Sequence, residues 1–426
     1  MMGKPAASMQ WNNTRSLAWP SLNDGWHMEA AEPYSRDAGQ LARLGETLLR
    51  HEKCNEAATA FEGAEQLSPG EFRNFVSFAH CYLSLGRPEA ALRVCERGGH
   101  VMPDSSDLHL LRGDALELLN RGAEARDAFV KAVATSDHAF TAAERLLSPL
   151  ASDSSGARLL ALCDELPPAY ANCTVVRGFR AIGLSQVGRI GEANQLVDLD
   201  KHVTQIAFRP PTEFGSVEHF NELLAEEIIS NPGLRYSMAY GFHRAENLDF
   251  KGARIFPVLA QFLRAAIMGF IAEFPRRGLD LILPPAPPQG FLRSAGNVVR
   301  YAERHHAHLH KFAYVSGVYH VLAPRSAKKA NDQAGALVLG SCDDFTGGDG
   351  ACWGRRNIRP EPGVATLFPS HIFHSVVPTH DEKPRIAVPF DLNIAVAPPI
   401  SATPGFRYKW LIQQRNYKLS YEGVQS

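Results

Sequence analysis

The sequence lacks the features that would place the protein in a membrane, in an oxidising compartment or on nucleic acid. No stretch approaches the roughly 18 consecutive apolar residues of a membrane span; even 265–274 is short and ends in charge. The seven cysteines are scattered and include no Cys-x-x-Cys pair, so we expect neither a disulfide framework nor a structural zinc site. The formal net charge of −1 gives no global electrostatic reason to bind nucleic acid or an acidic membrane.

The N-terminus also lacks the unbroken apolar stretch of a signal peptide. We therefore expect a cytoplasmic protein with no membrane and no nucleic-acid partner. A chain of 426 residues is too long for one compact core, so two or three domains are expected.

Small and apolar residues recur at a fixed spacing in the N-terminal half. Four sets of positions lie 34 residues apart, namely Gly45, Ala79 and Gly113; Ala57, Ala91 and Ala125; Phe61, Cys95 and Phe129; and Ala64, Gly98 and Ala132. Ala181 and Ala193 resume this register after a degenerate unit at about 140–173. Small residues at fixed positions let two helices approach closely, and one such hairpin must stack on its neighbours to bury its apolar face. The spacing predicts a stack of helical hairpins.

The first unit resembles the tetratricopeptide repeat. The positions that match the pattern of that family are Leu41, Leu44, Gly45, Leu48, Ala57, Phe61, Ala64 and Pro69. We predict five units over residues 38–205. Two roles remain open for them: a structural scaffold that could hold a homodimer, or, as the resemblance implies, a groove that holds a peptide or protein.

After Phe208 the pattern changes from helical repeats to strands. A helix with apolar spacing follows, then a longer one at about 252–274 and a proline-rich connector at 283–290. Short β-rich runs then alternate with glycine and proline, which is typical of an antiparallel sandwich or jelly roll. The Gly-rich segment 341–354 would be either a mobile lid or an idle surface loop.

Histidines gather in this second half. Five of the 17 lie between positions 305 and 320. If the segment is an extended strand, His306, His308 and His310 share one face and His305 points to the other. His374 follows later, and Arg385 comes eleven residues after it.

This set suits a nonhaem iron centre. Such an iron needs three ligands on one face and open positions for oxygen and a cosubstrate. Two ligands can come from alternating residues of one strand and the third from a strand opposite. A nearby arginine can then bind a carboxylate through two parallel hydrogen bonds.

Two motifs resemble a family of 2-oxoglutarate- and Fe(II)-dependent oxygenases, a branch of the prolyl-hydroxylase-like superfamily. HLHKFAYVSGVYHV is similar to its "HxH, then SGVYYV" signature, and FPSHIFHSVVP to its "FPSWLxHxVxP". The resemblance extends over about 215–395 and includes Asn297 ahead of the histidines.

The resemblance implies that His308, His310 and His374 bind Fe(II) and that Arg385 binds the far carboxylate of 2-oxoglutarate. With O2 as the oxidant, the enzyme would hydroxylate an unactivated C–H bond of a small molecule, a peptide, a protein or a carrier-bound intermediate. Most of the superfamily has His-x-Asp where this chain has His308 and His310, so which of these and His306 bind metal stays open.

Other side chains of the segment have weaker assignments. His371 stands at a family tryptophan and is expected to line the pocket, while His320 replaces a tyrosine and would line the substrate cavity or be structural. Asp343 and Asp344 lie far from the His-x-His pattern and are not expected to be ligands.

We therefore predict an α+β protein, a tetratricopeptide-type superhelix followed by a double-stranded β-helix (jelly roll) with flanking helices. The expected parts are 1–37, an extension; 38–205, the repeats; 206–400, the oxygenase-like domain; and 401–426, a tail. Two alternatives remain. One is a cupin-like dioxygenase with three histidines and no 2-oxoglutarate, although no glutamate follows His310 at the expected distance. The other is an adaptor whose jelly roll is a metal-free relic.

Overall fold

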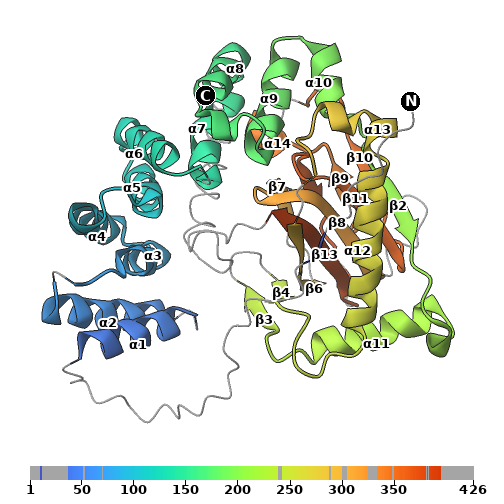
Figure 1. Cartoon of the computed structure of the whole chain (residues 1–426), viewed down its shortest axis with the longest axis horizontal. Helices are drawn as coiled ribbons and strands as arrows, with labels where there is room; N and C mark the ends of the chain where they lie inside the picture. Colours follow the sequence, from blue (N-terminus) through green and yellow to red (C-terminus); the bar gives the residue numbers. More distant parts are fainter. Residues whose placement is uncertain are drawn as a thin grey trace. The chain divides into compact units, whose positions relative to one another are not determined.

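The structure is a computed structural model of the chain (Figure 1). It describes residues 10–11, 37–50, 53–69, 71–137, 139–237, 242–286, 289–299, 305–324, 333–347, 350–379, 381 and 383–394. Most of the predicted extension (1–37) and all of the predicted tail (401–426) lie outside these residues. The chain divides into two compact units, and the division falls between Leu146 and Leu147.

Ten α-helices follow one another along the described residues between Ala38 and Leu196. Their bounds are α1 (Ala38–Arg50), α2 (Cys54–Leu67), α3 (Phe75–Ser84), α4 (Pro88–Val101), α5 (Ser106–Leu118), α6 (Gly122–Thr135), α7 (Phe140–Ser152), α8 (Gly156–Glu165), α9 (Thr174–Gln186) and α10 (Ile190–Leu196). The predicted helical repeats are thus confirmed. Their predicted end at residue 205 stays a prediction, and the compact units divide earlier, inside α7.

The recurring small residues lie where neighbouring helices touch. A Cβ atom added to Gly113 of α5 would lie 2.2 Å from the ring of Phe129 in α6, and one added to Gly45 of α1 would lie 2.6 Å from Phe61 in α2. Both phenylalanine side chains are fully buried. The 34-residue spacing therefore reflects a repeated close approach of two helices. At each approach an aromatic ring fills the space beside the glycine.

The second unit contains two sheets of a jelly roll. The larger sheet has the order β2-β11-β8-β13-β6-β4-β3, with β5 also paired to β13 and β1 paired to β5. Its strands are β1 (Gln10–Trp11), β2 (Thr204–Ala207), β3 (Arg235–Ser237), β4 (Phe242–Ala245), β5 (Gln289–Ser294), β6 (Gly296–Val299), β8 (Ala313–Leu322), β11 (Val364–Pro369) and β13 (Arg385–Ile394).

The smaller sheet has the order β10-β9-β12-β7. Its strands are β7 (His305–His308), β9 (Leu337–Leu339), β10 (Arg356–Ile358) and β12 (His374–Val376). Apart from the parallel β1–β5 pair, the strand pairs of both sheets are antiparallel. Helical repeats followed by a jelly roll are the predicted fold class, which is confirmed.

Two helices flank the larger sheet, α11 (Val217–Ile229) and α12 (Phe256–Ala272). Helix α12 lies along the sheet (Figure 1), and its apolar side chains belong to the same buried cluster as those of β8, β11 and β13. The remaining short helices are α13 (Phe274–Arg277), α14 (Asp343–Thr346), η1 (Pro168–Tyr170), η2 (Thr212–Phe214) and η3 (Leu279–Leu281).

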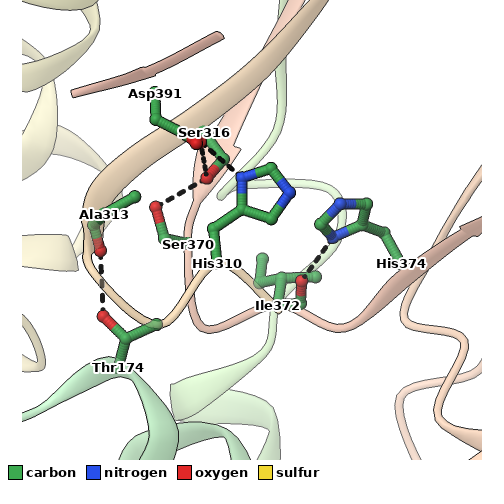
Figure 2. A network of polar contacts seen from close by, with 8 residues as sticks. All are labelled: Thr174, His310, Ala313, Ser316, Ser370, Ile372, His374 and Asp391. Carbon is green, nitrogen blue, oxygen red and sulfur yellow. Dashed lines mark hydrogen bonds and ion pairs between the residues drawn. The ribbon is translucent and has the colours of Figure 1, made fainter. Parts of the chain in front are cut away.

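Helix α9 belongs to the same compact unit as the jelly roll and packs closely against it. Thr174, its first residue, donates a hydrogen bond to the carbonyl of Ala313 at 2.9 Å (Figure 2). A Cβ atom at Gly178 would lie 2.9 Å from the carbonyl oxygen of His371. The start of β8 and the turn before β12 are therefore supported by a helix. Among the described helices, none is both long and apolar enough to span a bilayer.

Candidate active site

Three histidines from three places in the chain meet between the two sheets. His308 ends β7, His310 lies in the turn that follows, and His374 begins β12. One ring nitrogen from each lies within 4.8 Å of the others. The ring centroids are 4.3 Å apart for His308 and His374, 4.9 Å for His310 and His374, and 5.3 Å for His308 and His310. The side chains predicted to bind iron are therefore brought together; their role as ligands stays a prediction.

Each of the three rings is held through Nδ1 by an oxygen that accepts a hydrogen bond. Nδ1 of His308 donates to the carbonyl of His306 at 2.9 Å, and Nδ1 of His374 donates to the carbonyl of Ile372 at 3.1 Å. Nδ1 of His310 bonds the carboxylate of Asp391 (Figure 2). A carbonyl oxygen can only accept, so the proton sits on Nδ1 and the lone pair of a neutral ring sits on Nε2. This is the tautomer in which Nε2 can bind a metal.

Burial keeps His374 in its uncharged form. The side chain of His374 is buried, and its pKa lies well below the ordinary value, first because of burial and then because of repulsion from His308 and His310. A neutral imidazole is the form that binds a metal ion. His374 is thus prepared to bind a cation rather than a proton.

A bulge on β7 overturns the strict alternation expected for residues 305–310. In the β12–β7 pair His374 lies opposite His308, but Val376 lies opposite His305 instead of His306. One extra residue on β7 reverses the facing of the side chains before it. His305 therefore points inward, where it stacks on Phe242 at 4.5 Å. The expectation that His306 shares the face of His308 and His310 is wrong.

Outside the cluster, His306 lies beside an acidic residue. Its side chain is 39% exposed, and its Nδ1 is 3.4 Å from the Asp344 carboxylate. The same carboxylate accepts a hydrogen bond from the backbone N–H of Ala307 at 2.6 Å. Asp344 thus supports the bulged strand, and Asp343 pairs with Arg355 instead.

Arg385, the first residue of β13, is buried without a counter-ion. Its side chain is 3% exposed, and burial lowers the pKa of its guanidinium to about 10, so it is still a cation at neutral pH. Its Nε has no hydrogen-bond partner, and no carboxylate of the described residues forms an ion pair with it. A buried, uncompensated charge is costly, which makes this position a candidate for an anionic ligand.

Further polar atoms without partners surround this guanidinium. Within the described part of the chain, both ring nitrogens of His320, Nε2 of His305 and Oγ1 of Thr379 are buried and make no hydrogen bond. The pKa values of His305 and His320 lie well below the ordinary value, chiefly because of burial, with repulsion from Arg385 also contributing. His305 also lies 6.4 Å from His308, so polar groups extend from the three-histidine cluster to Arg385.

Gly335, ahead of β9, lies directly against the side chain of Arg385. It has φ +72°, and a Cβ atom there would lie 2.9 Å from Cδ of Arg385 and 3.3 Å from Cγ2 of Thr379. Only glycine fits this backbone conformation and this contact without strain. Gly335 therefore lets the backbone lie close against the Arg385 side chain, beside buried polar atoms that have no hydrogen-bond partner among the described residues.

Two further residues named in the sequence analysis, His371 and Asn297, lie outside the three-histidine cluster. His371 is buried, and its Nε2 donates to the carbonyl of Leu196 at 2.8 Å, so it joins the jelly roll to the end of α10 and is not in the three-histidine cluster. Asn297 accepts a hydrogen bond from Arg244 at 2.7 Å. His305, Thr379 and Asp391 were not among the predicted site residues. No motif in the sequence around Thr379 or Asp391 indicates a role at this site. The inward position of His305 could not be predicted because it depends on the β7 bulge.

Comparisons with known proteins found one protein family and several similar solved structures. Residues 295–391 match the protein family described as "Putative 2OG-Fe(II) oxygenase". Among solved structures, a Pseudomonas putida prolyl-4-hydroxylase is similar over 47% of this chain and 96% of its own, with 17% identity and a TM-score of 0.32. MamA is similar over 38% of this chain and 88% of its own, with 14% identity and a TM-score of 0.33.

A third solved structure, YrrB, titled "a TPR protein with an unusual peptide-binding site", is similar over 38% of this chain and 88% of its own, with 13% identity and a TM-score of 0.32. No curated protein matches the chain. The match to the oxygenase family falls on the segment of the jelly-roll half that carries the three histidines and Arg385.

Proposed function

We propose that the protein is an Fe(II)- and 2-oxoglutarate-dependent oxygenase that hydroxylates an unactivated C–H bond. The observation that carries the proposal is the three-histidine cluster together with the buried Arg385, which has no ion-pair partner among the described residues. The histidines provide a site for a cation, and the arginine provides a site for an anion. A metal-chelating dicarboxylate would satisfy both.

The chain's own residues would hold and orient the cofactors. His308, His310 and His374 would bind Fe(II) through Nε2, because each Nδ1 is already engaged. Arg385 would bind the far carboxylate of 2-oxoglutarate, and Thr379 and His320 would add hydrogen bonds from their unpartnered atoms. When bound, Fe(II) and 2-oxoglutarate supply the oxidising chemistry with O2; the protein supplies placement and a dry cavity.

Apolar rings lie against the histidines and would keep water away from the proposed metal. The ring of Phe368 packs on His374 at 4.9 Å, and Phe242 covers His305. Apolar rings exclude water and protect an oxidising site from side reactions. His320, where the family tends to have tyrosine, would replace a hydroxyl donor by an imidazole N–H.

For the substrate we propose a peptide or protein, or an intermediate held on a carrier, bound by the helical hairpins. Stacked hairpins present extended surfaces that suit a chain-like ligand. We also propose a cytoplasmic location, which fits a chain whose seven cysteines are all free thiols.

Anaerobic titration tests the proposed cofactors. Addition of Fe(II) and then 2-oxoglutarate should produce the weak visible charge-transfer band of the chelated complex. The band should be absent in His374→Ala and should need more 2-oxoglutarate in Arg385→Ala. Asp343→Asn, which alters a carboxylate paired with Arg355, is the matched control and should behave like the wild type.

The outcomes separate this proposal from its alternatives. Tight iron binding without the band, and turnover independent of 2-oxoglutarate, would favour the cupin-like dioxygenase. No iron binding at all would leave the adaptor. The buried cation at position 385 argues against both, because neither calls for an anion at that place.

A further inference from the structure

The charge of the three-histidine cluster is the starting point. A ligand set of two histidines and one carboxylate brings one negative charge to a divalent metal, whereas three neutral imidazoles bring none. If the proposed function is right, the site of this chain lacks that direct negative charge. A carboxylate nevertheless lies one ring away from the metal position, on β13.

Asp391 bonds Nδ1 of His310, and its side chain is only 14% exposed. It also accepts a hydrogen bond from Ser316 Oγ at 2.7 Å. Since a carboxylate can only accept, the Ser316 hydroxyl proton points to Asp391. In the 2.8 Å contact between the two serine hydroxyls, Ser370 is therefore the donor and Ser316 the acceptor (Figure 2). The donors run in one direction, from Ser370 through Ser316 to Asp391.

The direct polar contacts of the Asp391 carboxylate are with the His310 ring and the Ser316 hydroxyl. No lysine or arginine of the described residues forms an ion pair with it, and its closest basic neighbour is the His310 ring. The carboxylate therefore contacts this imidazole directly, whereas Arg293, its neighbour across the β13–β5 pair, acts on it from a longer distance.

We propose that Asp391 is the positioning residue of the metal site and supplies, through His310, the negative charge that the histidine ligands lack. Its carboxylate fixes the proton of His310 on Nδ1 and turns the Nε2 lone pair toward His308 and His374. It also makes that ring a stronger donor, as carboxylates bonded to metal-binding histidines do. This inference rests on the proposed function, since it presumes a metal on the three histidines.

Metal affinity and the spectrum of bound Co(II) test the inference on the full chain without requiring turnover. Asp391→Asn keeps the shape but removes the charge, and its amide can turn an N–H toward Nδ1. We expect about 10- to 100-fold weaker Co(II) binding and an altered visible d–d band. Asp343→Asn, whose carboxylate pairs with Arg355, is the control and should bind as the wild type does.

A double-mutant cycle separates this role from a structural one. His310→Asp places a carboxylate in the ligand set itself, so the charge of Asp391 is no longer needed and repels the new ligand. In that background Asp391→Asn should leave Co(II) affinity unchanged or increase it, the reverse of its effect in the wild type. A loss of equal size in both backgrounds would overturn the inference, because it would show that Asp391 acts only on folding.

The failure of this inference is distinguishable from that of the proposed function. If the wild type binds no Co(II), both fall. If the wild type binds it and a folded Asp391→Asn binds it equally well, only the role of Asp391 falls. If Asp391→Asn does not fold, proton NMR of the Zn(II)-loaded wild type decides. A downfield ring N–H that is lost in His310→Gln supports the bond to Asp391, and its absence overturns it.

Discussion

His374 lies directly opposite His308 in the antiparallel pair β12–β7, and the two ring centroids are 4.3 Å apart. Backbone hydrogen bonds of the smaller sheet thus fix two members of the cluster relative to each other. Each ring is further tied by a carbonyl two residues earlier in its own strand or turn. A site built on paired strands keeps its geometry before any ligand arrives.

The first prediction concerns which histidines bind the metal. His308→Ala and His374→Ala should each lower Fe(II) or Co(II) affinity by about 100-fold or more, beyond the effect of altering a supporting residue. His306→Ala should change affinity little, because the β7 bulge places that ring beside Asp344. Anaerobic titration of the three variants measures this. Strong loss in His306→Ala with retention in His308→Ala would contradict the assignment.

A second prediction is that Arg385 is retained for ligand binding at the expense of stability. Arg385→Met removes a buried cation that has no counter-ion among the described residues and fills its space with an apolar chain. The apo protein should gain about 1 kcal/mol in free energy of unfolding, while 2-oxoglutarate affinity falls about 10- to 100-fold.

Urea unfolding and 2-oxoglutarate titration together measure both effects. Arg385→Lys is the comparison, since it keeps the charge but loses the two parallel hydrogen bonds, and it should also bind 2-oxoglutarate more weakly. A variant that is less stable and binds 2-oxoglutarate normally would show that the guanidinium is structural.

The sequence was sufficient to predict the fold class and the cluster, and its limits have a physical cause. The positions of Gly113 and Phe129 belong to a 34-residue repeat that can be seen in the sequence alone. His308 and His374 each lie in a short motif of consecutive residues, which can also be recognised without a structure. The β7 bulge is different, because it exists only in the register with β12. Asp391 reaches His310 through pairing of distant strands, so no local pattern indicates it.

The third prediction tests the close packing of the helical repeats. Gly113→Ala would improve helix propensity by about 1 kcal/mol, yet the new Cβ would lie 2.2 Å from the Phe129 ring. Overpacking should win, with a net loss of about 1–2 kcal/mol. Gly99→Ala, in α4, is the control: nothing lies within 4 Å of its added Cβ, so it should be neutral or stabilising. Equal effects in urea unfolding followed by far-ultraviolet circular dichroism would contradict the packing explanation.

The fourth prediction concerns the carboxylate that joins the two flanking helices. Glu227 of α11 accepts hydrogen bonds from the backbone N–H groups of Arg254, Ile255 and Phe256 at 2.6, 3.0 and 2.8 Å, at the start of α12. These are among the donors that a helix start leaves without partners, and a negative charge there is favourable. The capping residue therefore comes from another helix rather than from the chain next to α12.

Glu227→Ala should lower the free energy of unfolding by about 2–3 kcal/mol, because three donors lose a charged acceptor at once. Glu226→Ala, an exposed neighbour in the same helix, should change stability by less than about 0.5 kcal/mol. Helix α12 covers the sheet that carries Arg385 and Asp391, so Glu227→Ala should also weaken 2-oxoglutarate binding. Urea unfolding and 2-oxoglutarate titration of both variants measure the two effects. If the two alanine variants are equally stable, the contact between Glu227 and α12 does not hold the flanking helices together.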